Sequence, residues 1–466
     1  IVLILLAFFI LAIGLGDELI QPAQTRVFEA IICRKFYDVH DPSVISPGEH
    51  NGWWDDGSKR GVLLGIHEKW CKVPQVQGEL AMLKGWDTGL GSIGSLFLAI
   101  PWGWFADCYG RKPLVVMLSV AFWLKAVWMQ LVSYFWQTFE IKLVWVSALH
   151  SLLGGSSAVA SAVVFTVVTD VTTETERTAA YFRIGAASMT AMFVSPPISS
   201  FLMDRNPWIA MLIGLGIMII PIPCTLLLPE TLKYKPAPPP TAVSSTPEIE
   251  PDDPIWKRYF KAAWHVIHDS FAFLSSDLRL FFLVTAFMLH MLFIVGIKDV
   301  LLQFGSIRYD LSLAKSTLLL SIRAGLNLVL MLFVLPAFSN YLNCRPAFSV
   351  HPTTVDLILA RASVTLQAIG FFILALAVNL PWFIIGLLLN TSGWGLMVYV
   401  RSLAISMVEP HAVARLYALM SVMDTVGMMV GSPSLAGLFE AGVNWGGLWT
   451  GLPFLMCAIL AAVVGI

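Results

Sequence analysis

Six ionisable side chains inside long apolar stretches of this 466-residue chain could take part in chemistry. They are Asp17, Glu18, His150, His290, Arg323 and Asp424. A charged side chain at the centre of a bilayer costs at least about 2.5 kcal/mol unless it faces protein or water. A carboxylate or imidazole in such a place can exchange a proton when its surroundings change. We expect Asp424 or Glu18 to carry a proton and Arg323 to bind an anionic group of a solute; for each residue alone, a structural pair or a water-satisfied polar group is the alternative.

Three amide side chains lie in the same apolar stretches: Gln21, Asn327 and Asn390. They are further candidates for hydrogen bonds to a solute, although buried amides also hold membrane helices together. Lys125 lies deep in another apolar stretch, and the sequence offers no role for it.

These residues belong to a chain with a membrane composition. Hydrophobic residues make up 57% and charged residues 13%, whereas soluble domains carry roughly 25% charged residues. Runs long enough to cross a hydrocarbon core of about 30 Å recur along the chain. They predict an all-α membrane protein with twelve spans, near residues 1–25, 78–103, 113–135, 141–169, 178–203, 207–229, 278–301, 313–337, 363–379, 381–404, 412–437 and 445–466.

Lysine and arginine are richer in the connections after the even-numbered spans than after most odd-numbered ones. The positive-inside rule therefore places those connections and both termini in the cytoplasm. The plasma membrane is the expected location, with the vacuolar membrane as the alternative.

The long connection after the first span is bracketed by Cys33 and Cys71. On the outer side both thiols would meet oxidising conditions, which favours a disulfide that closes this loop. Two free thiols are the alternative, because spacing alone does not fix geometry.

A proline-rich acidic tract, PAPPPTAVSSTPEIEPDDP at 236–254, lies between the sixth and seventh predicted spans. Such a tract buries no core and is typical of a flexible linker. Aromatic and basic residues recur at helical spacing after it, which predicts a helix lying in the membrane interface. The chain thus divides into a first bundle (1–229), a cytoplasmic linker with this helix (230–277) and a second bundle (278–466).

The string GWFADCYGRKP at 103–113 follows the second span. Gly103 and Gly110 permit a tight turn and close helix approach, and Asp107 and Arg111 supply charges that can pair across the seam between the two halves. The string resembles the loop signature of the major facilitator superfamily.

A polar pattern recurs in the two halves. Asp170, Arg177 and the pair SP at 195–196 follow the fourth span, and Glu409, Arg415 and SP at 432–433 follow the tenth. This is what duplication of a six-helix unit leaves. A second copy of the 103–113 string is expected after the eighth span. Asp356 and Arg361 are the candidate replacements there for the charged pair Asp107 and Arg111.

The resemblance implies two pseudo-symmetric six-helix bundles around a central cavity that would receive the ionisable residues above. The strings ICRKFYDVHDPSVI, KWCKVPQVQGELAML, LPETL and DLILARAS resemble fungal members related to the proton-coupled folate and tetracycline transporter groups. The implied function is alternating-access transport of a small organic solute, with protons and the bilayer as partners and a monomer as the unit. The string SPPISS at 195–200 resembles a signature of drug/proton antiporters and favours export slightly; proton-coupled uptake and a transport-inactive nutrient receptor are the alternatives.

Other classes find little support. A net charge of −1 argues against a nucleic-acid partner. Motifs for zinc hydrolysis or phosphate binding are missing from the sequence, so we expect neither an enzyme nor a cofactor.

Overall fold

The protein is almost entirely helical in the computed structural model, which describes residues 2–45, 62–154, 156–172, 174–231, 278–334, 337, 352–408 and 413–465. Ten stretches of described helix are long and apolar enough to cross a membrane. With α2 (Pro74–Tyr109) and α9 (Leu278–Arg308) they make the twelve spans that the sequence predicts.

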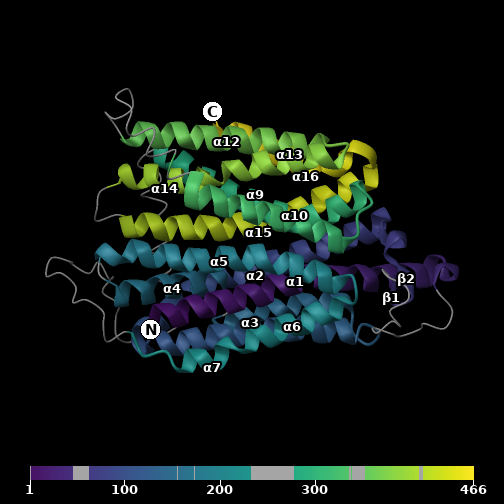
Figure 1. Ribbon diagram of the computed structural model, residues 1–466, viewed down its shortest axis with the longest axis horizontal. Coiled ribbons are helices and arrows are strands. Elements are labelled where there is room, and N and C mark those ends of the chain that lie inside the picture. Colours follow the sequence, from purple (N-terminus) through teal and green to yellow (C-terminus); the bar gives the residue numbers. More distant parts are fainter. Residues whose placement is uncertain are drawn as a thin grey trace, which may run out of the picture.

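The spans form two bundles of six, stacked as a lower purple-to-teal layer and an upper green-to-yellow layer in Figure 1. The first contains α1 (Val2–His40), α2, α3 (Arg111–Tyr134), η3 (Ile141–Leu153) with α4 (Ser157–Val171), α5 (Glu174–Met203), and α6 (Pro207–Ile219) with α7 (Pro221–Leu226). The second contains α9, α10 (Leu313–Val329) with η5 (Leu330–Val334), α12 (Pro352–Leu376), α13 (Leu380–Ser392) with η6 (Gly393–Gly395) and α14 (Leu396–Ser406), α15 (Val413–Trp445), and η8 (Gly447–Gly451) with α16 (Leu452–Gly465).

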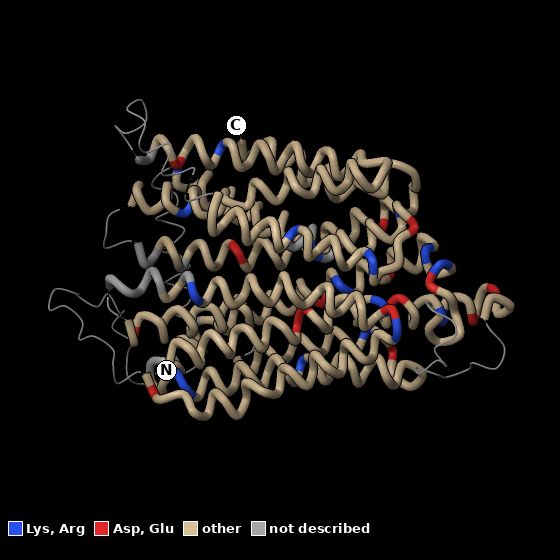
Figure 2. The backbone as a smooth tube through the Cα atoms, in the orientation of Figure 1, with Lys and Arg blue, Asp and Glu red and all other residues tan. Residues whose placement is uncertain are grey.

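Short elements connect α1 to α2 at one end of the molecule. They are η1 (Pro42–Val44), the antiparallel strands β1 (Val62–Leu63) and β2 (Ile66–His67), and η2 (Glu68–Cys71). We call this end the hairpin end, and the opposite end, where α2 turns into α3, the motif end (Figure 1). Charged residues are sparse along the middle of the bundles and gather at the hairpin end (Figure 2).

Helices that carry polar residues at their ends run further than the apolar runs predict. The first span was predicted to end at residue 25, but α1 continues to His40. Likewise α12 begins at Pro352, so Asp356 and Arg361 lie on a helix and not in the loop to which the sequence assigned them. The central part of the linker, residues 232–277, with its predicted interfacial helix, lies outside the described residues.

The two bundles meet along α2 against α15 and α5 against α10. Near the hairpin end a Cβ added at Gly85 would come within 2.6 Å of Ala436, and one added at Gly89 within 2.8 Å of Pro433. About five helical turns after Gly85, and so on the same face, a Cβ at Gly103 would meet nothing within 4 Å in the described part of the chain. The halves are therefore closed on one another towards the hairpin end.

Candidate functional site

In the described part of the chain, an ion pair between Lys298 and Glu18 joins the two bundles in the middle of the molecule. The Nζ atom of Lys298 on α9 lies 2.9 Å from Oε1 of Glu18 on α1. The side chain of Glu18 is 11% exposed and that of Lys298 is 31% exposed. Lys298 was not among the sequence candidates, although a lysine inside the predicted span 278–301 was a signal that could have found it.

A small cavity of about 50 Å³ surrounds this pair. It is lined from both halves by Glu18, Met189, Met192, Ile294, Lys298, Leu320, Arg323, Ala324, Asn327 and Trp394. Sites that hold drug-sized ligands measure about 300–1,000 Å³. The cavity would have to widen to accept an organic solute of that size.

Arg323 and Trp394 give the cavity its chemical character. The guanidinium carbon of Arg323 lies 5.3 Å from the centre of the Trp394 ring. Within the described ranges no carboxylate lies within 4.0 Å of Arg323. Trp394 lies in η6, where a Gly-Trp-Gly string interrupts the α-helix of the tenth span. Trp394 was not among the residues expected from the sequence, although a tryptophan between two glycines inside a span was an available signal.

Asn327 and His290 lie close to the same ring system. Asn327 lines the cavity, and its Nδ2 atom lies 3.7 Å from the sulfur of Met189. His290 is buried, and its ring meets that of Trp394 edge-on with centroids 6.3 Å apart. Asn390 is buried on α13, where its backbone abuts Gly370 of α12. Asn327 is therefore at the cavity, whereas His290 and Asn390 support its wall and the helix packing behind it.

Asp17 and Gln21 line a different cavity, of about 120 Å³, inside the first bundle. Gln21 donates a hydrogen bond of 2.9 Å to Asp17. Lys125 shares this cavity and lies 3.5 Å from Asp87 of α2, which explains a lysine so deep in the third span. Neighbouring residues on a helix point about 100° apart, so Asp17 and Glu18 face different cavities.

His150 lies behind this second cavity. Its Nδ1 atom is 2.8 Å from the carbonyl oxygen of Ser147, whose hydroxyl donates a 2.8 Å hydrogen bond to Asp87. His150 thus belongs to the polar interior of the first bundle.

Asp424 is half-buried on α15, and it is not among the residues that line the central cavity. Arg401 of α14 is the charged side chain that acts on it. The Arg401 guanidinium lies between the rings of Phe287 and Tyr417, at 5.3 and 5.8 Å from their centroids. Asp424 and Arg401 therefore form a second charged position in the second bundle.

At the motif end, Arg111 and Asp170 of the first bundle pair with one another. Arg111 lies 3.5 Å from Asp170, and both side chains are buried. Glu230 accepts hydrogen bonds from the backbone N–H groups of Arg111 and Lys112 and so caps the start of α3. Gly110 has φ +106°, as the expected tight turn requires.

The other candidate gate residues at the motif end are Asp356, Arg361, Glu409, Asp107, Arg177 and Arg415. Asp356 accepts a 2.6 Å hydrogen bond from Ser402, and Arg361 is exposed. Glu409 lies outside the described residues, as do the side chains of Asp107, Arg177 and Arg415.

The SPPISS string lies where α5 packs on α1. Ser195 and Ser199 donate hydrogen bonds of 3.1 and 2.9 Å to the carbonyl oxygens of Leu15 and Leu19. Close helix packing therefore accounts for these serines.

The disulfide candidates lie together at the hairpin end. Cys33 of α1 is bonded to Cys71 of η2, with Cα atoms 5.3 Å apart.

Comparison with known proteins gives one family. Residues 78–432 match the sequence profile of the Major Facilitator Superfamily. Similar curated proteins include the MFS-type transporter aprT of Aspergillus flavus (29% identity, 98% of this chain and 85% of that protein) and the MFS efflux pump atnC of Emericella nidulans (29%, 99% and 87%).

Solved structures with the same fold include the nucleoside transporter NupG (TM-score 0.58, 13% identity, 98% of this chain and 97% of that one). Another is the human organic anion transporter MFSD10 (TM-score 0.56, 15% identity, 100% and 98%). With the profile match over most of the chain and twelve spans in two bundles, the chain belongs to the major facilitator superfamily.

Proposed function

We propose that this secondary transporter exports a small organic anion with an apolar or aromatic body, in exchange for protons, by alternating access. The observation that carries the proposal is Arg323, a cation on the face of Trp394 in a cavity shared by the two bundles. A guanidinium in this setting binds a carboxylate or similar anion by charge-assisted hydrogen bonds.

The rest of the cavity wall suits an apolar body. Met189, Met192, Ile294 and Leu320 face the same space. Methionine side chains adapt to ligands of different shape, which fits a transporter that accepts several related solutes.

The electrostatics of the cavity favour one carboxylate over the other as the proton carrier of an exporter. Glu18 shares the cavity with Arg323 and Lys298, so a negative solute would bind better when Glu18 is protonated. Proton and anion would then move in the same direction, as in uptake. Exchange instead needs a carboxylate that is protonated while the cavity holds no anion. Asp424 does not line the cavity, so its protonation does not depend on a bound anion there. Export therefore favours Asp424, and the efflux-pump names of similar fungal proteins favour export.

The test is transport by purified protein in proteoliposomes, with a panel of fluorescent organic anions and an imposed pH gradient. Arg323→Ala should lower uptake of anions at least tenfold while leaving the protein folded. Arg205→Ala is a matched control, because Arg205 also lies on an aromatic ring, at 5.2 Å from Phe201, but at the hairpin end. Equal transport by wild type and Arg323→Ala would exclude the anion site.

Asp424→Asn tests the coupling in the same vesicles. It should abolish transport driven by the pH gradient and preserve exchange of labelled for unlabelled anion. If instead Glu18→Gln alone removes the gradient effect, the proton travels with the solute and the direction is uptake.

A further inference from the structure

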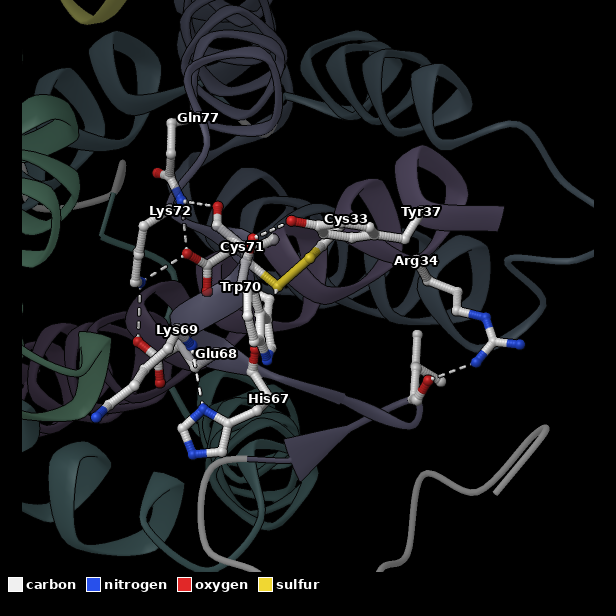
Figure 3. The surroundings of a disulfide bond; sticks show 12 residues. Cys33, Arg34, Tyr37, His67, Glu68, Lys69, Trp70, Cys71, Lys72 and Gln77 are labelled. Carbon is white, nitrogen blue, oxygen red and sulfur yellow. Dashed lines mark hydrogen bonds and ion pairs between the residues drawn. A yellow bond between two sulfur atoms is a disulfide. The ribbon is translucent and has the colours of Figure 1, made fainter. Parts of the chain in front are cut away.

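The connection between α1 and α2 carries a buried network of charges at the hairpin end (Figure 3). Glu29 is fully buried and accepts from Lys72 at 2.8 Å, Gln77 at 2.6 Å and Arg26 at 3.2 Å. Glu68 in turn lies 3.0 Å from Lys72 and 3.4 Å from Arg26. Two carboxylates and two cations thus neutralise one another inside the protein, as buried charges must.

This network fixes η2 to the first bundle. The Cys33–Cys71 disulfide joins η2 to α1, and Gln77 of α2 donates a 2.9 Å hydrogen bond to the carbonyl oxygen of Cys71 (Figure 3). Tyr37 of α1 donates a 3.0 Å hydrogen bond to the carbonyl oxygen of Trp70. With a covalent bond and these hydrogen bonds, η2 must move with the first bundle as one body.

Glu68 also makes a contact with the second bundle. Its Oε1 atom accepts a 2.7 Å hydrogen bond from the backbone N–H of Leu313, the first residue of α10 in the second bundle. The first N–H groups of a helix lack partners within the helix and carry partial positive charge, so a carboxylate there is well placed. Ser312 already caps the N–H of Lys315, and Glu68 satisfies Leu313.

Apolar side chains seal the same place. Leu302, Leu313 and Ala314 of the second bundle belong to a buried cluster with residues of the first, among them Ile66 and Trp208. A cavity of about 310 Å³ adjoins the contact and is lined from both halves, by Glu68 and Asp204 on one side and Asp310 and Lys315 on the other.

We propose that Glu68 is the latch of a gate at the hairpin end: η2, held to α1 by the disulfide, keeps this end shut by binding the start of α10 through Glu68, and the latch releases when the bundles tilt to open the path there. Glu68 acts as a positioning residue, because it holds the bundles and does not touch the solute. The proposal rests on the alternating-access part of the proposed function, and it is independent of solute, proton and direction.

The latch predicts a measurable shift between closed and open populations. A hydrogen bond to a charged group contributes enough to change an equilibrium by about tenfold or more. Removing it should therefore raise the fraction of molecules open at the hairpin end by about tenfold.

The experiment measures this opening directly, without a solute. Spin labels at Asp204 and Asp310, which line the shared cavity from opposite bundles, report the distance by pulsed electron paramagnetic resonance in lipid nanodiscs. The other four cysteines are replaced by serine, so that the disulfide remains.

Two variants separate the latch from the charge network. Glu68→Gln keeps the length and removes the charge. Glu68→Asp keeps the charge for Arg26 and Lys72 but is one methylene shorter, so its carboxylate falls short of Leu313. Glu68→Asp should raise the long-distance population about tenfold. Glu68→Gln should raise it by a smaller factor, because its amide oxygen can still accept from the N–H of Leu313 but carries no charge. Asp38→Asn is the matched control, because Asp38 pairs at 3.1 Å with Arg34 of its own helix and makes no described contact with the second bundle.

Unchanged distance distributions in both Glu68 variants would overturn the latch, even if anion transport is found. A shift in both variants would support it even if every tested anion fails to move. If Glu68→Gln does not fold, Glu68→Asp decides, since it retains the neutralising charge.

Discussion

Breaking the Glu18–Lys298 pair should weaken the state in which the bundles are joined, and the structure sets the size of the effect. At 2.9 Å and an effective dielectric constant of about 20, two unit charges attract by about 6 kcal/mol. Lys298 is 31% exposed, and water screens exposed pairs to about 1 kcal/mol or less. Glu18 is 11% exposed, and losing the partner of a buried charge costs about 3–5 kcal/mol. We expect a coupling between these limits, about 1–3 kcal/mol.

The assay is a double-mutant cycle. Glu18→Gln, Lys298→Met and the double variant are unfolded by titration of mixed detergent micelles, and each free energy of unfolding is compared with that of wild type. Each single variant leaves one charge of the pair without its partner, whereas the double variant removes both charges and leaves Arg323 in the cavity. The double variant should therefore be more stable than the sum of the single losses predicts.

Additive losses, within about 0.5 kcal/mol, would refute this reasoning. They would mean that the two charges do not depend on one another, and that the pair does not join the bundles.

Three further predictions concern stability. Replacing Cys33 or Cys71 by serine should lower the free energy of unfolding by up to about 4 kcal/mol, which is the chain-entropy value for a bridge with a sequence separation of 38. Thermal unfolding with and without reductant measures this loss. Burial raises the pKa of Glu68, but Arg26 and Lys72 outweigh burial and hold the pKa below its ordinary value of 4.5. The contribution of Glu68 to the free energy of unfolding should therefore be full above pH 4.5 and be lost as the pH falls through the lowered pKa. Unfolding measured at a series of pH values checks this. Gly85→Ala should destabilise the protein, because its Cβ would lie 2.6 Å from Ala436, whereas Gly437→Ala, with open space around it, should be neutral or stabilising in the same thermal assay.

The twelve spans could be predicted because each depends on a local property, an apolar run long enough to cross the bilayer. The predicted span 113–135 nearly coincides with α3, Arg111–Tyr134. The errors lie where a helix continues beyond the hydrocarbon core. Polar residues there meet water or other protein groups, so hydropathy no longer reports the helix, as the ends of α1 and α12 show.

The site was less predictable, because the facing of a side chain is set by packing between helices. Asp17 and Glu18 are adjacent in the sequence, yet one faces the interior of the first bundle and the other faces the second bundle. Arg323 was identified because a charge in a span stands out against its neighbours. Trp394 was missed because an aromatic residue in an apolar run does not, and only the cavity reveals its place beside Arg323.

The contacts between the bundles indicate how such a protein can be held firmly and still move. Apolar packing at Gly85 and Gly89 is short-ranged and vanishes with small separation. Two of the charged contacts in the described part of the chain, Glu18 with Lys298 and Glu68 with the start of α10, lie at different depths. A tilt that opens the hairpin end would therefore stretch the contact at Glu68 before the one at Glu18. Each is a polar interaction beside apolar packing of the two bundles, strong enough to favour the closed state and weak enough to break in thermal motion. The contacts between the bundles should therefore break in order, from the hairpin end inwards. A Glu68 variant should open the hairpin end while the Glu18–Lys298 pair stays intact.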